Sequence, residues 1–251
     1  MHIAEEFMLH KIIPINIGGF DLSITQAVLW MWIASIIMML YLIYCSRSMT
    51  VVPSNRLVTL FEVLIDFVRK DLVESFMHGK DVERFFPLIA SIFFFIFASN
   101  FIGIIPGTYT PTANINTTAI LAIFVFILYN VLGVFRNGLV GYLKSIVVPG
   151  LPTPIIPVVF VIEVVSHFAR PLSLAIRLFA NMMAGHIIIG VLIYLALLAT
   201  GAFMGGIMLG SVSFAASVGM YFLEVFVKSL QAIIFAVLTS MYIAGAVAPE
   251  H

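Results

Sequence analysis

An arginine lies in the middle of an apolar stretch, where a permanent charge is costly. Residues 154–200 are hydrophobic enough to enter a membrane, and Arg177 lies near their centre. A guanidinium keeps its proton in proteins, and placing one at mid-bilayer costs roughly 2.5–3.5 kcal/mol on insertion scales. No acidic residue lies within four positions of Arg177. We therefore expect its partner on another helix or another subunit, and we interpret the arginine as a functional residue that faces a carboxylate or a wet cavity.

A histidine and a glutamate form a second candidate group. His186 follows Arg177 in the same apolar stretch, and Glu224 lies in the next one. If the two stretches form a hairpin that turns near residues 203–207, each residue is about 18 positions from the turn and reaches a similar depth. Histidine titrates near neutral pH, so a histidine–carboxylate pair in the outward half of a membrane protein predicts a proton relay.

Polar residues follow one face of each apolar stretch when they are placed at about 100° per residue. The first stripe contains Glu163, His167, Arg170, Arg177 and Asn181, whereas His186 falls on a different face. The second stripe contains Ser217, Tyr221, Glu224, Lys228, Gln231 and Tyr242. Each arm of the expected hairpin therefore carries one polar face.

Structural roles compete with functional ones in the first stripe. Glu163 could extend its carboxylate to the cytoplasmic interface. His167 is more simply an interior histidine with satisfied hydrogen bonds than a ligand. Arg170 precedes a proline, which suits an interfacial anchor or a cap for backbone carbonyls at a bend.

Similar alternatives apply between the two stripes and within the second one. Asn181 and Gln231 could form ordinary interhelical hydrogen bonds. Glu224 and Lys228, four residues apart, suit a structural ion pair. Lys228 fits that role, or a side chain that reaches the interface, better than the role of a proton carrier. At Arg177 the functional interpretation outweighs the structural one.

The composition is that of an integral membrane protein. The chain has 251 residues, of which 62% are hydrophobic and only 10% are charged, and its mean hydropathy is +1.16. Soluble domains carry about 25% charged residues. Several apolar runs reach the ~20 residues of a helical span, and the short alternating segments of a barrel are absent. The formal net charge is zero and no basic patch lies outside the apolar runs, which excludes nucleic acid as a partner.

We expect an all-α polytopic membrane protein with about five membrane-crossing helices and an amphipathic surface helix. The spans are expected at about 24–44, 85–105, 118–135, 155–200 and 207–246, and the amphipathic helix within 46–84. Residues 1–251 would form a single membrane domain with three parts. These are an outer N-terminal segment (1–23), peripheral helices with the amphipathic helix (24–153), and a tilted hairpin that carries the ion path (154–251).

Charge and length predict the orientation of these elements. The loops 46–84 and 136–153 hold nearly all basic residues outside the apolar runs, so the positive-inside rule places them on the cytoplasmic or matrix side. The last two helices, of about 40 residues each, would be roughly 60 Å long against a ~30 Å hydrocarbon core. They must tilt, bend or extend beyond the bilayer.

Four sequence motifs carry a resemblance to a known family. They are RPLSLAIRLFANMMAGH at 170–186, LQAIIFAVLT at 230–239, NFIGIIP at 100–106 and PTANINTT at 111–118. The chain resembles subunit a of the F-type ATP synthase membrane sector from about residue 20 to its end. The block around Arg177 is the most specific of the four.

The resemblance implies a non-catalytic stator subunit and roles for six residues. Arg177 would face the carboxylates of the rotating c-ring, and Glu163 would lie on the cytoplasmic exit path. The outer half-channel would be lined by Asn181, His186, Glu224 and Gln231. The implied partners are the c-ring, the peripheral-stalk subunit b, the rest of the ATP synthase and the lipid bilayer, without cofactor or metal. Lys228 departs from the family pattern, where an apolar or small residue is expected. The implied location is the bacterial or the mitochondrial inner membrane.

Two other functions are considered. A secondary transporter could bind an anion at Arg177, although the inverted repeats of such proteins are not found. A haem-binding membrane subunit could use His167 and His186, but these lie about 100° apart on one helix and could not both ligate one haem. The His-Glu-x-x-His motif of a metalloprotease and the Gly-x-x-x-x-Gly-Lys-Ser/Thr loop of a nucleotide-binding head are both absent.

Overall fold

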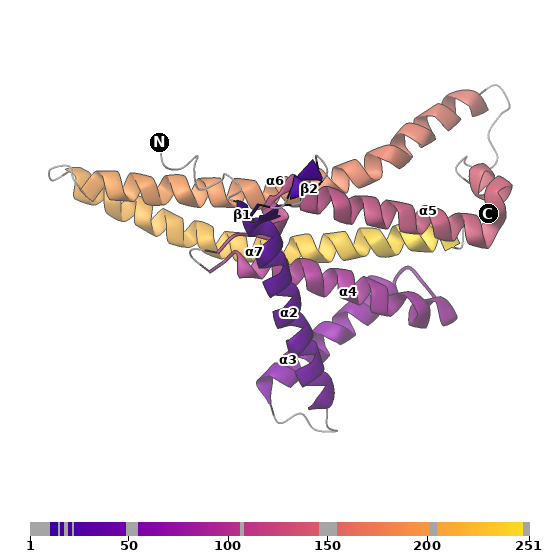
Figure 1. Ribbon diagram of the computed structural model, residues 1–251, viewed down its shortest axis with the longest axis horizontal. Helices are drawn as coiled ribbons and strands as arrows, with labels where there is room; N and C mark the ends of the chain where they lie inside the picture. The colour runs from indigo at the N-terminus through magenta and orange to yellow at the C-terminus, as the bar shows by residue number, and fades with distance from the viewer. Residues whose placement is uncertain are drawn as a thin grey trace. The chain divides into compact units, whose positions relative to one another are not determined.

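The computed structural model describes residues 11–14, 16–17, 20–21, 23–48, 55–105, 108–145, 155–200 and 205–247. Figure 1 shows its helices and strands. The contacts between residues divide the chain into two compact units. Unit 1 comprises Met1–Met38, Phe95–Asn114 and Leu178–Gln231. Unit 2 comprises Met39–Phe94, Ile115–Arg177 and Ala232–His251.

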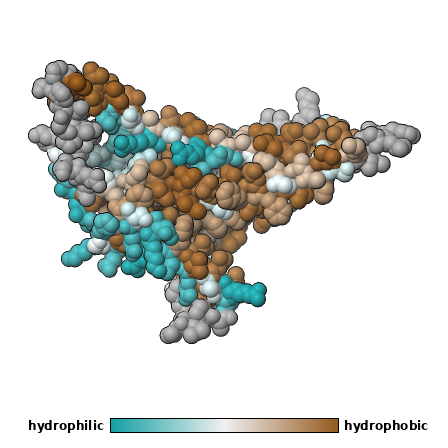
Figure 2. Space-filling model, turned by 180° about the vertical axis from the view of Figure 1, so that it is seen from behind, coloured by the Kyte–Doolittle hydropathy of each residue, from teal (hydrophilic) through white to brown (hydrophobic). Residues whose placement is uncertain are grey.

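Five of the described helices are long and apolar enough to cross a membrane. They are α2 (Gln26–Arg47), α4 (Lys80–Ile102), α5 (Ile115–Ser145), α6 (Ile156–Thr200) and α7 (Gly205–Val247). This confirms the all-α polytopic fold and the five spans expected from the sequence. Figure 2 shows hydrophobic side chains over much of the visible face, with hydrophilic side chains gathered in separate patches. Apolar side chains that face outward suit a lipid environment.

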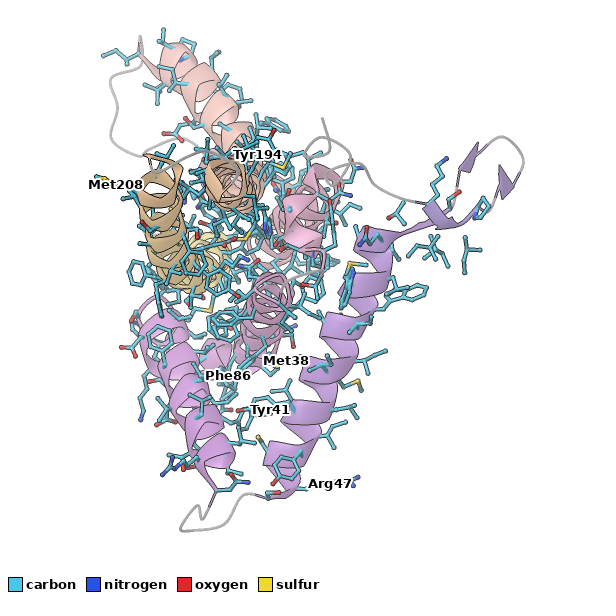
Figure 3. All side chains as sticks on the ribbon, turned by 90° about the vertical axis from the view of Figure 1, so that its left-hand side faces the viewer. Met38, Tyr41, Arg47, Phe86, Tyr194 and Met208 are labelled. Carbon is cyan, nitrogen blue, oxygen red and sulfur yellow. The ribbon has the colours of Figure 1, made fainter. Side chains whose placement is uncertain are left out.

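An amphipathic helix follows α2, as the sequence predicts. The helix α3 (Arg56–Phe67) begins where the side chain of Asn55 accepts a hydrogen bond from the backbone N–H of Leu57, and it continues into the π-helical turn η1 (Val68–Val73). Phe61 is buried on one side of α3, and Tyr41 of α2 points toward it, with ring centroids 6.0 Å apart (Figure 3). The location of α3 at a membrane surface stays a prediction.

Prolines and glycines shape the long helices. Pro171 lies inside α6 and Pro87 inside α4. In α5, Gly138 has φ +70° and ψ 163°, a conformation that a residue with a side chain rarely adopts, and it bends the helix. The proline-rich run 149–154 lies outside the described residues, as does the start of the glycine-rich stretch after α6.

Four short strands near the N-terminus were not expected from the sequence. They are β1 (Lys11–Ile13), β2 (Asn16–Ile17), β3 (Phe20–Asp21) and β4 (Ile24–Thr25), with β1 paired to β4 and β2 to β3, all antiparallel. Two or three residues per strand are too few for alternation to be recognised in the sequence.

Candidate ion path

The predicted histidine–glutamate pair meets in unit 1. Beyond Leu178, α6 runs antiparallel to the first half of α7 (Figure 1). This brings His186 Nδ1 to 3.8 Å from Glu224 Oε1. Glu224 is buried, and a quarter of the His186 side chain is exposed. The structure therefore confirms the proximity that counting residues from the hairpin turn predicted.

Gly185 gives the glutamate the room for this approach. A Cβ atom built at Gly185 would lie 3.0 Å from Glu224 Oε1 and 3.2 Å from its Cδ and Cγ atoms. Any side chain at this position would have to displace the carboxylate. The glycine before His186 thus allows the close packing of α6 against Glu224.

Lys228 forms an internal ion pair with Glu224. Its Nζ lies 3.0 Å from Glu224 Oε1 and donates a hydrogen bond to the carbonyl oxygen of Gly103 at 3.1 Å. The residue is 0% exposed. The ion-pair interpretation of Lys228 is therefore the correct one, since a lysine that reached the interface would expose its ammonium group.

The end of α4 and the segment after it complete this cluster. Thr110 Oγ1 lies 2.7 Å from His186 Nε2. Thr112 donates to Asn100 Oδ1 at 2.6 Å, and Asn100 Nδ2 donates to the backbone oxygen of Lys228 at 3.1 Å. Asn100, Thr110 and Thr112 were not among the residues predicted for the site. An asparagine in the last turn of an apolar span was the available signal, because its amide must find partners there.

Asn181 and Gln231 form a second contact between α6 and α7. Asn181 Nδ2 donates to Gln231 Oε1 at 2.7 Å, which confirms the expected interhelical hydrogen bond. Gln231 is 1% exposed, and its Nε2 has no hydrogen-bond partner among the described residues. A buried amide N–H without a partner costs free energy. The Gln231 amide group is therefore suited to bind a water molecule or another polar group between α6 and α7.

His167 is held as an interior histidine of unit 2. Its Nε2 lies 2.9 Å from Asn130 Oδ1, and the Tyr142 hydroxyl donates to the same oxygen at 2.8 Å. Because an amide oxygen only accepts hydrogen bonds, His167 Nε2 carries the proton in this arrangement. In unit 1, His186 Nε2 faces Thr110. With this nitrogen engaged in both histidines, the geometry does not favour a haem ligand at either position.

Arg170 and Glu163, which also belong to the first stripe and to unit 2, differ in their partners. The guanidinium of Arg170 lies 5.6 Å from the centre of the Tyr242 ring, a cation–π contact between α6 and α7. Glu163 is half-buried and makes no hydrogen bond or ion pair with another described residue. Its carboxylate is free to interact with solvent or with another chain.

Arg177 is exposed on the apolar helix α6. Within the described part of the chain, it has no hydrogen bond, ion pair or ring contact. The structure therefore does not bring Arg177 into contact with the other candidates. An exposed, unpaired guanidinium on a membrane-crossing helix requires a partner from outside the chain or a wet surface.

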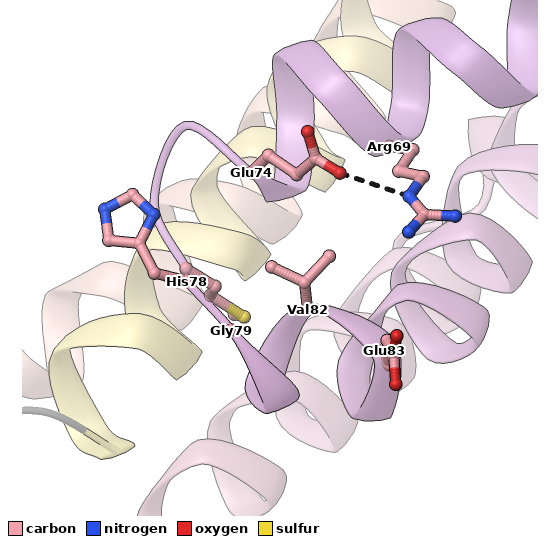
Figure 4. Close-up of a pocket in the computed structure, with 7 residues that line it drawn as sticks. Arg69, Glu74, His78, Gly79, Val82 and Glu83 are labelled. Atoms are coloured by element: carbon pink, nitrogen blue, oxygen red, sulfur yellow. Dashed lines mark hydrogen bonds and ion pairs between the residues drawn. The ribbon is translucent and has the colours of Figure 1, made fainter.

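One cavity lies away from these residues. It measures about 370 Å³ and is lined by side chains of η1, the start of α4 and the turn between them (Figure 4). Its lining includes the Arg69–Glu74 ion pair, with Nε and Oε1 3.1 Å apart, and His78. The cavity contains none of the six predicted site residues. Among the described residues, no group of three histidine, cysteine or acidic side chains could hold a metal ion.

Comparisons with known proteins decide the family. The family model described as "ATP synthase A chain" matches residues 28–244. The protein "ATP synthase subunit a" of Rhizobium rhizogenes is 39% identical over 249 residues, which cover 98% of this chain and 97% of the relative. The chain belongs to the ATP synthase subunit a family. Proteins of the same name from Chloroherpeton thalassium and Magnetococcus marinus are 37% and 34% identical, over 98% of this chain and 73% and 93% of their own lengths.

Membership of the subunit a family agrees with the helices described here. The match begins in α2 and ends in α7, so it includes all five apolar helices. The chain is an integral membrane protein. The motifs that suggested the family, around Arg177, Gln231 and Asn100, lie on α6, α7 and α4.

Proposed function

We propose that this chain is the proton-conducting stator subunit of an F-type ATP synthase. The observation that carries the proposal is Arg177, a cation that is exposed on the apolar helix α6 and forms no ion pair with another described residue. A charge at this position is stabilised by an anion that another subunit supplies. In the subunit a family, the resemblance assigns that anion to the carboxylates of the c-ring.

The cluster in unit 1 supports an outer half-channel. His186 and Glu224 provide two titratable groups 3.8 Å apart. Asn181 and Gln231 provide amide groups that can hold water between α6 and α7. A proton that enters from outside would pass along these side chains to a ring carboxylate.

Glu163 supports a separate path on the cytoplasmic or matrix side. It lies more than three helical turns before Arg177 on α6, and its carboxylate makes no hydrogen bond or ion pair with another described residue. A carboxylate that keeps contact with water can accept a proton from the ring and release it. Glu163 would therefore serve the exit path, with Arg177 separating the two half-channels.

The charge of the ring carboxylate couples these paths to rotation. A protonated carboxyl can enter lipid, whereas an ionised one cannot, because burying an unpaired charge is prohibitively costly. Approach to Arg177 favours the ionised form, so the proton leaves there. Each charge that crosses gains about 2.3 kcal/mol per 100 mV of membrane potential. The resulting torque would drive ATP synthesis in a catalytic head that other subunits form.

The surface around Arg177 suits close contact with another helix. Ser173, Ala180 and Ala184 lie within about 40–60° of Arg177 on α6, and all three are exposed. Small side chains let helices in a membrane approach closely. The implied neighbours are the c-ring at this surface, the peripheral-stalk subunit b elsewhere, and lipid. The complex would lie in a bacterial or mitochondrial inner membrane.

A reversible cross-link tests this function. Ser173→Cys is combined with a cysteine near the carboxylate on the outer helix of the ring, in a background where Cys45, the only cysteine of the chain, is replaced by serine. Oxidation should join the two subunits and stop ATP-driven proton pumping in inverted vesicles. Reduction should restore the pumping, because only the disulfide prevents rotation.

Leu172→Cys is the matched control. Leu172 is 61% exposed but is turned about 140° from Arg177 on the same helix. It should form little cross-link with the ring. A complex that is fully cross-linked through Ser173→Cys and still pumps would contradict the stator function. Cross-linking through Leu172→Cys alone would show that another face of α6 meets the ring.

A further inference from the structure

Lys228 is fully buried, although lysine is almost never fully buried unless it is paired. Its ammonium group contacts Glu224 Oε1 at 3.0 Å and the carbonyl oxygen of Gly103 at 3.1 Å. Taking an ammonium ion out of water costs several kcal/mol. A lysine that is kept at this cost beside a group of the proposed path must affect how that group binds protons.

Glu224 lies between the side chains of a lysine and a histidine. The same oxygen, Oε1, is 3.0 Å from Lys228 Nζ and 3.8 Å from His186 Nδ1. An opposite charge within about 4–6 Å favours the ionised form of a carboxyl group. Lys228 therefore supplies a counter-charge at contact distance from the Glu224 side chain, whether or not His186 carries a proton.

Among the described residues, no other lysine or arginine forms an ion pair with Glu224. The titratable and charged groups that the described chain places around it are His186 on α6 and Lys228 and Tyr221 on α7, while the segment after α4 adds the carbonyl oxygen of Gly103 and the hydroxyl of Thr110. The Tyr221 hydroxyl donates to the carbonyl oxygen of Ile104. Without Lys228, His186 would be the one cationic partner that the described residues place beside Glu224.

Packing also holds the carboxylate in place. The Cα atom of Gly185 approaches so closely that a Cβ atom there would come within 3.0 Å of Glu224 Oε1. Asn100, which is itself buried, donates to the backbone oxygen of Lys228. The lysine is therefore anchored at its backbone by α4 and at its ammonium group by Gly103 and Glu224.

We propose that Lys228 is a positioning residue of the outer path, which keeps Glu224 as a fixed carboxylate and leaves His186 as the group that takes up and passes on the proton. This inference rests on the proposed proton path. A lysine in this role does not pass a proton along the path. It sets the pH range in which the outer path works.

The test measures how ATP synthesis depends on the pH at the outer face. Inverted vesicles are first incubated in acidic buffer, which sets the pH of the lumen. The external pH is then brought to a fixed value, and a fixed potassium diffusion potential is applied. Lys228→Met removes the charge and keeps the chain length, whereas Lys228→Gln keeps a hydrogen-bond donor for Gly103. Without the cation, burial favours a protonated carboxyl at Glu224. The lumen pH of half-maximal rate should rise by roughly 1–3 units in both variants.

Two outcomes would overturn the inference. A wild-type profile in Lys228→Met would show that the charge does not affect the path. A wild-type profile in Lys228→Gln, together with a shifted one in Lys228→Met, would show that the lysine acts only through its hydrogen bond to Gly103. Arg177→Ala in the same vesicles separates the two proposals. If Arg177→Ala synthesises ATP normally, the proton path itself is wrong.

A variant that fails to assemble still decides the question. Loss of one partner leaves a buried charge uncompensated, which is strongly destabilising, whereas loss of both charges is much less so. If Lys228→Met does not assemble with the ring, the double variant Lys228→Met/Glu224→Gln should assemble. Failure of the double variant would show that Lys228 fills space rather than balancing Glu224.

Discussion

Inverted vesicles that contain Arg177→Ala are expected to lose ATP-driven acidification, with an initial rate lower by about two orders of magnitude. An opposite charge near a carboxyl group shifts its proton equilibrium by roughly 10- to 1000-fold. Without Arg177, which is exposed and unpaired on α6, a ring carboxyl would keep its proton as it passes. The direct route between the half-channels would also lose its barrier, so passive proton flux should rise. Acidification and passive flux are both measured with a pH-sensitive dye.

Arg47→Ala is the matched control for this loss. Arg47 is also exposed on an apolar helix, but it lies in the last turn of α2 rather than inside the apolar stretch. Its removal should leave pumping close to the wild-type rate. Co-purification of the ring shows that each variant assembles. Normal pumping by an assembled Arg177→Ala complex would mean that the arginine is structural.

Gly103→Ala is expected to prevent stable assembly of the chain. The added Cβ atom would overlap the Thr110 hydroxyl and would lie 2.7 Å from Thr110 Cβ and 3.1 Å from its Cα. The backbone that carries Thr110 would have to move, which would withdraw the partners of His186 and Lys228. Overpacking costs roughly 1–3 kcal/mol, and a buried charge that loses its partner costs more. The amount of the chain recovered with the ring measures the effect.

Gly190→Ala makes the same change where there is space. A Cβ atom at Gly190 would meet nothing within 4 Å. Alanine is favoured over glycine in a helix by about 1 kcal/mol, so this variant should assemble as well as the wild type or slightly better. Equal recovery of Gly103→Ala and Gly190→Ala would contradict the tight contact between Gly103 and Thr110.

The long helices could be predicted because length and composition determine them. An apolar run can satisfy its backbone in a membrane only as a helix, and α6 and α7 begin and end within two residues of the expected positions. The bend at Gly138 could not be predicted, since a glycine in an apolar helix is tolerated without a bend. The small strands before α2 depend on pairing between short segments that have no periodic pattern.

The candidate site was predictable where its residues lie on the hairpin. The contact between His186 and Glu224 could be predicted by counting residues from the turn. The contact between Lys228 and Glu224 could be predicted from their helical spacing. The contributions of Asn100 and Thr110 depend on how the end of α4 packs against α7 and α6, which no local pattern encodes. The functional roles of all these residues stay predictions.

The spacing of Glu224 and Lys228 also affects how the chain is made. Each charge at the centre of a helix adds roughly 2.5–3.5 kcal/mol to the free energy of insertion by the translocon. Glu224 and Lys228 are one turn apart on α7, so this helix leaves the translocon with its counter-ion already in place. Arg177 has no such neighbour on α6. During biogenesis, the charge of Lys228 is therefore balanced within its own helix, whereas the apolar residues of α6 have to offset the charge of Arg177 until another chain supplies a counter-charge.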